Sequence, residues 1–470
     1  MLRPWNINIR LNSSSEKAIY LQIADAIIDD IRNGRLSSGT ALPGSRQLAE
    51  LLKVNRNTIV DALEVLLIEG WLVSRERKGT FVAEELPQLN KTRKMAADST
   101  KAIPQPKYRI QFDDGYPDSK VAPVNELARA YRQIFNRKAK WQMMGYGDPL
   151  GDHGFREEIA RMLNHQRNMH ITEADVCITR GSQMAMYLAA QCLVKPGDYV
   201  MIEDPGYKPA WLALEKAGAK LLPVSVDEDG LAIEDVIKHL KTKKVRALYT
   251  TPHRQYPTTV TLSLQRRLQL ISLSNEYGFT IIEDDYDNEF HFGYRPVHPL
   301  SSFAELENYI YIGTLSKVVA PSLRIGYLVT KNQGLIRTIA DLRKLIDVQG
   351  DTIMEQAVLE LIRDGTIRRH IRKASNYYKE KRDAVAQMLT KQLSGKANLQ
   401  VPEGGLAFWI IPLKKTDWSG VQQKLSAQGI LISTPENYSF KKSCNGLRIG
   451  YGALTEQQLK EGVAALARLL

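Results

Sequence analysis

Residues 312–327 read IGTLSKVVAPSLRIGY and place a lysine, Lys317, directly after an apolar strand. Two hydroxyl residues, Thr314 and Ser316, precede this lysine, and Arg324 follows it. A lysine that forms a Schiff base needs a partly desolvated site, because its amine must stay nucleophilic. Hydroxyl groups and an arginine are suited to hold a phosphate. The stretch predicts either a covalent site for a phosphorylated carbonyl cofactor or an ordinary lysine at the end of a strand.

Short apolar runs alternate with helical patterns on both sides of this stretch. Runs of strand type cover residues 176–179, 199–202, 247–250, 280–283 and 310–312. Strands that alternate with helices over this length predict a mostly parallel sheet covered by helices on both faces. We therefore expect a large α/β domain over residues 111–345 and a smaller C-terminal α+β subdomain over residues 346–470.

The carboxyl ends of three predicted strands carry groups that suit the same cofactor. Residues 281–287 (IIEDDYD) place carboxylates after an apolar strand, and pyridoxal chemistry needs one carboxylate to keep the pyridine nitrogen protonated. The alternative for such a cluster is a magnesium site. Residues 179–184 join a strand to a helix whose N-terminus can hold a phosphate. Tyr207, after the next strand, offers a ring to stack on a flat cofactor.

The first 83 residues have a different pattern, with three helical segments followed by two β-like runs. Apolar residues at 19, 23, 27 and 31 lie on one face of the first helix, and Gly34 ends it. Ser45 is expected to cap the second helix, and residues 56–66 form the third. The runs 70–74 and 79–82 predict a hairpin with a charged tip.

Two short helices joined by a tight turn and followed by a hairpin form a winged helix-turn-helix. In this motif the N-terminal end of the second of the two helices enters the major groove of DNA. Polar and basic residues lie where side chains or backbone would reach bases or phosphates: Arg46, Arg56, Asn57, Thr58, Lys78, Gly79 and Thr80. The alternative is a three-helix accessory domain with solvated arginines. Residues 1–83 are therefore predicted to bind double-stranded promoter DNA.

The formal net charge of +12 is unevenly distributed. Residues 1–85 contain eleven Lys and Arg against eleven Asp and Glu, whereas residues 86–110 contain six against one. A short basic segment is typical of nucleic-acid-binding linkers. Because residues 84–110 also show little periodicity, we expect them to form a basic, flexible linker.

Composition excludes several other classes of protein. With 43% hydrophobic and 25% charged residues, the chain has the composition of an ordinary globular protein. No apolar run approaches the roughly 18–20 residues of a membrane helix, and the first residues show no signal-peptide pattern. The three cysteines, Cys177, Cys192 and Cys444, lie far apart, so neither a disulfide framework nor a zinc site is expected. We expect a cytoplasmic protein without a structural metal.

Four segments of the N-terminal region resemble the GntR type of bacterial DNA-binding domain. They read YLQI (20–23), LPGSRQLA (42–49), VNRNTI (54–59) and GWL (70–72). The resemblance covers nearly all of residues 15–83. One departure is Gly44, where such domains usually have serine.

The order of motifs from about residue 145 to 455 resembles the fold-type I aminotransferases, which use pyridoxal 5'-phosphate (PLP). The resemblance implies that Lys317 forms the internal aldimine and that Asp284 pairs with the pyridine nitrogen. It also implies that Tyr286 bonds the ring hydroxyl and Tyr207 stacks on the ring. It assigns the phosphate to a cup formed by Gly181, Ser182, Gln183, Thr314, Ser316 and Arg324.

Two further positions bear on the substrate. Arg448 matches the arginine that binds a substrate carboxylate; the alternative is a surface arginine on an edge strand. Residues 256–259 read YPTT where aminotransferases usually have Asn-Pro-Thr-Gly, so Tyr256 replaces the asparagine that contacts the ring hydroxyl.

A GntR-type head on an aminotransferase-like body is similar to the MocR subfamily of regulators. The resemblance implies a PLP-dependent regulator that senses an amino compound, or PLP itself, through aldimine chemistry at Lys317, with little or no complete transamination. It also implies a head-to-tail homodimer that reads two half-sites on DNA. Two alternatives remain: a working aminotransferase with an accessory DNA-binding domain, and a DNA-binding protein whose body has lost the cofactor.

Overall fold

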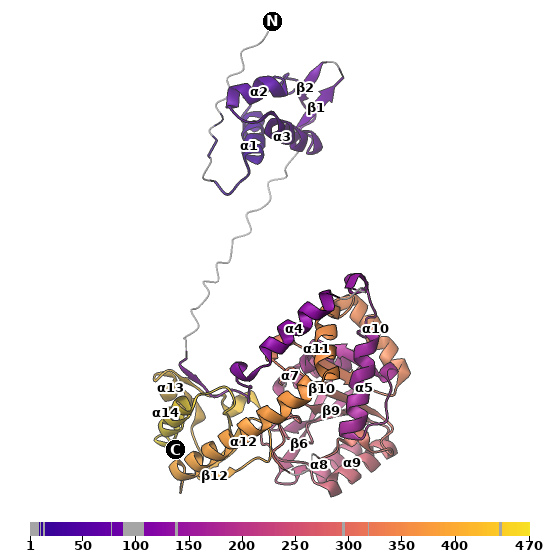
Figure 1. Cartoon of the computed structure of the whole chain (residues 1–470), viewed down its shortest axis with the longest axis vertical. Helices are drawn as coiled ribbons and strands as arrows, with labels where there is room; N and C mark the ends of the chain where they lie inside the picture. Colours follow the sequence, from indigo (N-terminus) through magenta and orange to yellow (C-terminus); the bar gives the residue numbers. More distant parts are fainter. Residues whose placement is uncertain are drawn as a thin grey trace. The chain divides into compact units, whose positions relative to one another are not determined.

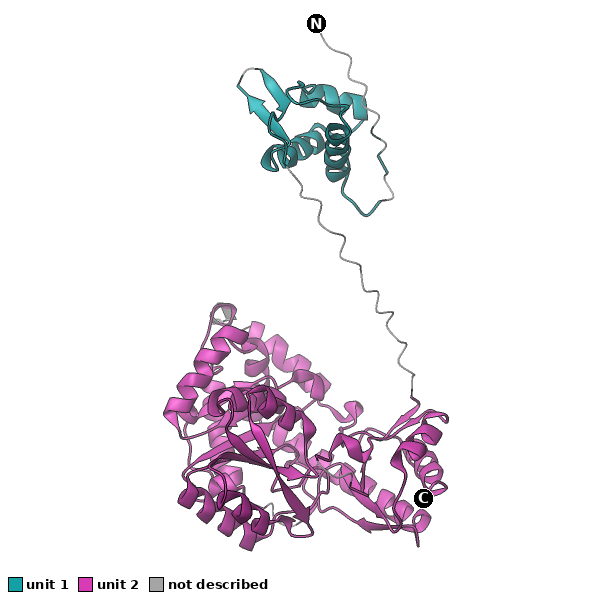
Figure 2. Cartoon of the chain, turned by 180° about the vertical axis from the view of Figure 1, so that it is seen from behind, with its two compact units in different colours: residues 1–104 teal, residues 105–470 magenta. Residues whose placement is uncertain are grey.

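The computed structural model describes residues 9, 11–12, 15–76, 78–87, 108–136, 140–293, 297–317, 319–440 and 444–470. The chain divides into two compact units, residues 1–104 and 105–470 (Figure 2). Most of the predicted linker over 84–110 lies outside the described residues, so its flexibility stays a prediction.

The N-terminal unit consists of three helices and a β-hairpin. Helix α1 (Ile19–Arg32) packs on α3 (Arg56–Ile68), and a short turn joins α2 (Ser45–Leu52) to α3. Strand β1 (Leu72–Arg75) pairs antiparallel with β2 (Gly79–Val82). The three helices and the hairpin share one apolar core, in which Ile27, Ile59 and Leu66 are buried. The predicted winged helix-turn-helix fold is confirmed.

Ile19, on the apolar face of α1, is 41% exposed, because it lies in the first turn, ahead of the residues that reach the core. One local prediction about this unit is wrong. Ser45 does not cap α2: Gly44 occupies the N-cap position without a side-chain hydrogen bond, and Ser45 is the first helical residue. The Ser45 hydroxyl instead accepts a hydrogen bond from Arg56 Nε at 3.4 Å.

The second unit is built on an eight-stranded sheet of order β4-β11-β10-β9-β8-β5-β6-β7 (Figure 1). Neighbouring strands are parallel except at β11, which is antiparallel to β4 and β10, and at β7, which is antiparallel to β6. The predicted mostly parallel sheet is confirmed. The strands are β4 (Val176–Thr179), β5 (Tyr199–Asp204), β6 (Lys220–Asp227), β7 (Gly230–Leu231), β8 (Val245–Thr250), β9 (Thr280–Asp285), β10 (Tyr309–Thr314) and β11 (Gly326–Val329).

Helices cover both faces of this sheet, because successive side chains of each strand point to opposite faces. Ile281 of β9 packs into the core on one face, whereas Ile282 packs into the core on the other. The first face is covered by α5 (His153–Arg167), α8 (Ile233–Leu240), α9 (Leu264–Tyr277) and α11 (Thr352–Arg363), and α4 (Val124–Phe135) packs on α11. The second face is covered by α6 (Ser182–Leu193), α7 (Lys208–Lys216) and α10 (Gln333–Ile346).

A separate core includes the long helix α12 (Thr366–Gln392) and a three-stranded antiparallel sheet. This sheet contains β12 (Ala397–Gln400), β13 (Ala407–Pro412) and β15 (Leu447–Gly450), with α13 (Trp418–Ser426) and α14 (Glu456–Ala467) in the same core. Strand β3 (Ile110–Gln111) pairs with β14 (Ile430–Leu431) in this core, whereas α11 packs with the large sheet. The smaller core therefore includes Ile110 and Phe112, and the larger core includes α11. No described helix is long and apolar enough to cross a membrane.

Candidate cofactor site and nucleic-acid interface

The carboxyl ends of four parallel strands meet at one edge of the large sheet. Strand β4 leads into α6, β5 leads to Tyr207, β9 ends with Asp284 and Asp285, and β10 leads to Lys317. Open α/β sheets bind their ligands at this edge. The fold thus brings to one place residues that lie more than 130 positions apart in the sequence.

Asp284 lies at the buried end of β9. Its Oδ2 accepts a hydrogen bond from the Tyr249 hydroxyl at 2.9 Å, whereas the buried Oδ1 has no hydrogen-bond partner among the described residues. Desolvation raises the pKa of Asp284 to about 7, although the Tyr249 hydroxyl opposes this rise. A buried oxygen without a donor is costly unless a ligand supplies one. Oδ1 therefore fits the protonated pyridine nitrogen of PLP.

Lys317 lies close to Tyr286 at the same edge. Its Nζ is 4.6 Å from the centre of the Tyr286 ring. Desolvation lowers the pKa of Lys317, and the nearby Asp287 opposes this effect. A lowered pKa leaves a larger share of the amine neutral and nucleophilic. Asp287 is itself held by a buried ion pair with Arg254, Nε to Oδ1 at 2.8 Å.

The start of α6 and Arg324 approach each other closely. Gly181, at the N-cap of α6, has a φ of +78°, and a Cβ atom there would lie 2.7 Å from Arg324 Nη2. The positive φ favours glycine here, and the absence of a side chain leaves room for the Arg324 guanidinium. Ser182 and Gln183 form the first turn of α6, whose N–H groups favour an anion. This end of the sheet therefore has the donors and the positive charge that a phosphate needs.

The hydroxyls of Thr314 and Ser316, which precede Lys317, face the same neighbouring carbonyl. Thr314 Oγ1 and Ser316 Oγ donate hydrogen bonds to the Ile325 oxygen at 3.0 and 3.2 Å. Arg324 donates from Nη2 to the Arg180 oxygen at 3.1 Å. All six residues predicted for the phosphate cup lie around the junction of β4, β10 and β11.

Tyr207 follows β5 and contacts the start of α6. Its hydroxyl donates to Gln183 Oε1 at 3.3 Å, and its ring meets the Tyr256 ring edge-to-face at 5.2 Å. Tyr256, at the position where aminotransferases usually have asparagine, donates its hydroxyl hydrogen to Asp114 Oδ1 at 2.8 Å. The Tyr256 side chain, which replaces asparagine, is therefore bonded to Asp114, near the N-terminal end of the second unit.

Arg448 lies on β15, in the C-terminal core, and is 1% exposed. It donates hydrogen bonds to the backbone oxygens of Asp114 and Pro257 at 3.0–3.3 Å and to the Tyr286 hydroxyl at 3.4 Å. Within the described part of the chain, no carboxylate forms an ion pair with it. Burial excludes the alternative of a surface arginine, and the unpaired charge suits a carboxylate ligand.

Three groups of this site are not predicted from the sequence. They are Tyr249, which bonds Asp284; the Arg254–Asp287 ion pair; and Asp114, which bonds Tyr256. Tyr249 lies in a strand predicted from the sequence, but only the register of β8 beside β9 shows which face it occupies. Among the described residues, no group of three or more His, Cys, Asp and Glu side chains could hold a metal ion.

The N-terminal unit exposes its predicted DNA-binding residues. Asn55 caps α3 by accepting a hydrogen bond from the Asn57 N–H at 2.9 Å, and Arg56 and Asn57 are exposed in the first turn. Thr58 is half-buried beside them, and Arg46 is exposed in the first turn of α2.

The predicted wing is the β1–β2 hairpin. The Lys78 N–H donates to the Arg75 oxygen at 3.0 Å, which closes the turn. Lys78 and Gly79 are exposed at its tip, and Thr80 is half-buried. None of Arg46, Arg56 and Lys78 forms an ion pair with a described residue, so their charges are available to phosphates.

Residues 113–466 match the family described as aminotransferase class I and II, and residues 19–82 match the bacterial regulatory proteins of the gntR family. The chain belongs to the aminotransferase class I and II family. Its GntR domain, joined to this aminotransferase domain, gives it the architecture of the MocR-type regulators.

Relatives of full length share both domains. The chain is 27% identical over 478 residues to the probable rhizopine catabolism regulatory protein MocR of Rhizobium meliloti, across 97% of this chain and 94% of that protein. It is 26% identical to the HTH-type transcriptional regulator TauR of Rhodobacter capsulatus, across 98% of both chains. The aminotransferase domain is similar to the kynurenine aminotransferase of Pyrococcus horikoshii, solved in complex with PMP. The identity is 26% and the TM-score is 0.72, across 77% of this chain and 90% of that chain.

Proposed function

We propose that this MocR-type chain is a transcriptional regulator that holds PLP at Lys317 and changes its binding to promoter DNA when an amino compound reaches that site. The observation that carries the proposal is the buried, unbonded Oδ1 of Asp284 at the same sheet edge as Lys317. The GntR domain implies DNA binding, and the aminotransferase domain implies a small-molecule ligand.

The residues at the sheet edge would hold PLP by its three functional parts. Asp284 Oδ1 would accept a hydrogen bond from the pyridine nitrogen, and Tyr249 would keep the carboxylate in place. Tyr207 would cover the ring, and Arg324 with the first turn of α6 would neutralise the phosphate. When bound, PLP supplies an aldehyde that condenses with amines and a ring that accepts electrons.

Lys317 would provide the amine that anchors the cofactor. Its burial favours the neutral amine, which is the nucleophilic form. Asp287 stays ionised because Arg254 holds its pKa below the ordinary value in spite of desolvation. Asp287 therefore keeps its negative charge near Lys317, and Asp284 would accept the hydrogen bond from the ring nitrogen.

Arg448 would bind a carboxylate of the effector. Lys317 follows the large sheet, whereas Arg448 lies in the C-terminal core. A ligand held at both residues would link the two cores and favour one arrangement of them, which is a route from the ligand site to DNA affinity.

Tyr256 distinguishes this site from that of an efficient aminotransferase. Its hydroxyl is bonded to Asp114, so it does not offer the ring hydroxyl the contact that asparagine would. We propose that amino compounds bind and react with the cofactor but that repeated transamination is slow.

We also propose that the chain forms a homodimer, which presents two GntR domains to two half-sites on DNA.

The proposal is tested by loading the purified full chain with PLP and reducing it with borohydride. The visible absorbance of the bound cofactor should appear on loading and be lost on reduction, and peptide mapping should then find the reduced label on Lys317. Light scattering should show a dimer. A full chain that binds no PLP would contradict the cofactor assignment, and a monomer at working concentration would contradict the dimer.

A further inference from the structure

The region that contains the GntR domain has no excess of positive charge. Residues 1–85 contain as many acidic as basic residues, eleven of each. General affinity for DNA depends on the number of Lys and Arg that neutralise phosphates. The GntR domain brings no excess of positive charge of its own, so cations of the linker or of the second unit can add contacts with DNA phosphates.

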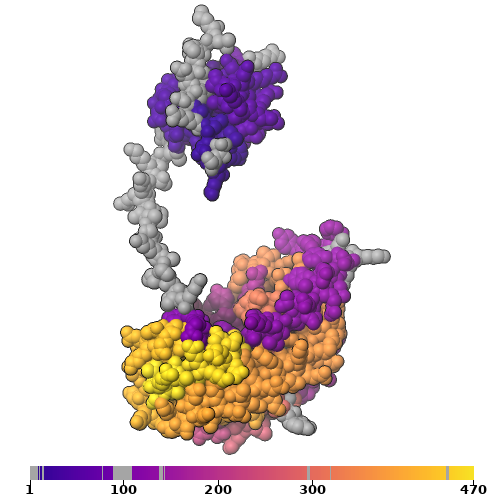
Figure 3. Space-filling model, turned by 60° about the vertical axis from the view of Figure 1, so that its left-hand side comes forward, coloured from indigo at the N-terminus to yellow at the C-terminus, as the bar shows by residue number. Residues whose placement is uncertain are grey.

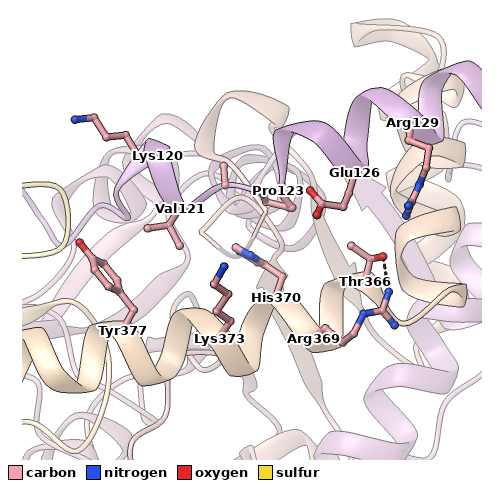
Figure 4. Close-up of a pocket in the computed structure, with 11 residues that line it drawn as sticks. Lys120, Val121, Pro123, Glu126, Arg129, Thr366, Arg369, His370, Lys373 and Tyr377 are labelled. Carbon is pink, nitrogen blue, oxygen red and sulfur yellow. Dashed lines mark hydrogen bonds between the residues drawn. The ribbon is translucent and has the colours of Figure 1, made fainter.

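A groove on the second unit gathers positive charge. It lies between η1 (Ser119–Val121) and α4 on one side and the first turns of α12 on the other, and encloses about 540 Å³ (Figure 4). Four Lys and Arg side chains line it, with Glu126 as the single acidic residue of its lining. We call it the basic groove; its cations are Lys120, Arg129, Arg369 and Lys373.

The positive charge extends beyond the basic groove along α12. Residues 366–379 contain five Lys and Arg and no Asp or Glu. Arg369 and Lys373 lie one turn apart and line the groove, while Arg368 and Arg372 are exposed beside them. Figure 3 shows the purple surface of α4 beside the orange surface of the helices that follow residue 350. A charged surface of this length suits a polyanion better than one compact anion.

The cations of the basic groove differ in how they are held. Arg129 Nη2 forms an ion pair with Asp364 Oδ2 at 3.3 Å, and Arg369 donates to the Thr366 hydroxyl at 2.9 Å. Lys120 and Lys373 are exposed and have no ion-pair partner among the described residues. His370 and Lys373 point from α12 towards the opposite wall in Figure 4, and Lys120 extends outward at the rim. Two cations are therefore oriented, and two are free to meet phosphates.

We infer that the basic groove is a second DNA-contact surface, which binds the sugar-phosphate backbone of duplex DNA without reading its sequence. This surface serves the proposed DNA-binding function, to which it adds affinity while the GntR domain adds sequence preference. A small phosphorylated ligand is the competing occupant, and the experiment below separates the two.

The test uses the full chain with Lys120→Gln and Lys373→Gln combined, and a duplex of mixed sequence several helical turns long. The affinity is measured between about 50 and 200 mM KCl. Two lost phosphate contacts should reduce the slope of log affinity against log salt by about 1.8. If the variant and the unmodified chain bind equally at about 1 M salt, the variant should bind about eightfold more weakly at about 0.1 M salt for each contact that it has lost.

The matched control is Lys216→Gln with Lys241→Gln, which removes the same charge from two exposed lysines outside the basic groove. The control should keep the original slope. An unchanged slope in the groove variant, or equal losses in both variants, overturns the inference. So does weaker binding of inorganic phosphate, measured by calorimetry, without a change in the DNA slope. If the unmodified chain binds no duplex at all, the proposed function itself fails, which is a different result.

Discussion

Replacing Asp284 by asparagine should change how the stability of the cofactor-free protein depends on pH. Desolvation raises the pKa of Asp284 from 3.8 to about 7. The folded protein therefore holds a proton that the unfolded chain releases above about pH 4, so stability falls as the pH rises through this window. Between about pH 5 and pH 8 the expected loss is about 2–3 kcal/mol. The Asp284→Asn variant should not lose this stability, because an asparagine side chain neither binds nor releases a proton in this pH range.

The assay is urea unfolding of the full chain at the two pH values, followed by the fluorescence of the buried Trp211, Trp409 and Trp418 of the second unit. Saturating PLP should flatten the pH dependence of the unmodified protein, because a protonated ring nitrogen stabilises the carboxylate. PLP should leave the pH dependence of Asp284→Asn unchanged. Equal pH dependence in the two proteins without PLP would refute the assignment of Asp284.

The neighbouring Glu283 provides the matched control. Its pKa is also raised to about 7 by desolvation, but its side chain bonds Leu300 and Ser301 on the other face of β9. Glu283→Gln should also reduce the pH dependence. The effect of PLP in this variant should equal its effect in the unmodified protein, because Glu283 does not face the ring.

Other variants test the remaining parts of the two sites. Lys317→Ala should abolish the visible absorbance of the bound cofactor but leave DNA binding intact; a label still trapped by borohydride would show that another lysine is the anchor. Tyr249→Phe should weaken PLP binding by about 1.5–3 kcal/mol, because it removes a hydrogen bond to a charged group; an unchanged Kd would mean that Asp284 needs no such support. Arg56→Ala should weaken DNA binding by about 1–3 kcal/mol and relax sequence preference. Arg46→Ala and Lys78→Ala should weaken binding to all sequences and lower the salt dependence. Unchanged binding in all three arginine and lysine variants would contradict the placement of α3 in the groove of DNA.

The sequence predicts the two folds well because both have a strong local pattern. The alternation of strands and helices from residue 176 onward is readable as an α/β sheet, and the glycine and lysine at 181 and 317 mark the ends of its strands. The hairpin at 72–82 is equally visible from its two β-like runs.

The contacts made across the fold are not visible in the sequence. Asp114 reaches Tyr256 across 142 positions, and Arg448 reaches Asp114 across 334. Which strand face Tyr249 occupies depends on register, which no local pattern specifies. The cap of α2 was predicted wrongly for a related reason, since Ser45 contacts Arg56 of the next helix instead of its own backbone.

The basic groove is also formed by segments that lie far apart in the sequence. Its walls come from residues 120–129 and 366–377, and neither segment indicates by itself that the other lies opposite. The run of cations in α12 is readable in the sequence, but an exposed basic helix is usually only a solvated surface. The groove becomes a candidate site only because the fold places Lys120 and Arg129 on the wall opposite α12.

The central claim is that an amino compound at Lys317 controls DNA affinity, and one measurement tests it most directly. The affinity of the PLP-loaded full chain for a selected operator duplex is titrated with a panel of amino donors, beside a steady-state transamination assay with 2-oxo acid acceptors. At least one donor should change the Kd for DNA in the unmodified protein and leave it unchanged in Lys317→Ala, while turnover stays far below the roughly 10 per second typical of enzymes. Turnover near that rate, with no donor affecting DNA binding, would show that the chain is a working aminotransferase.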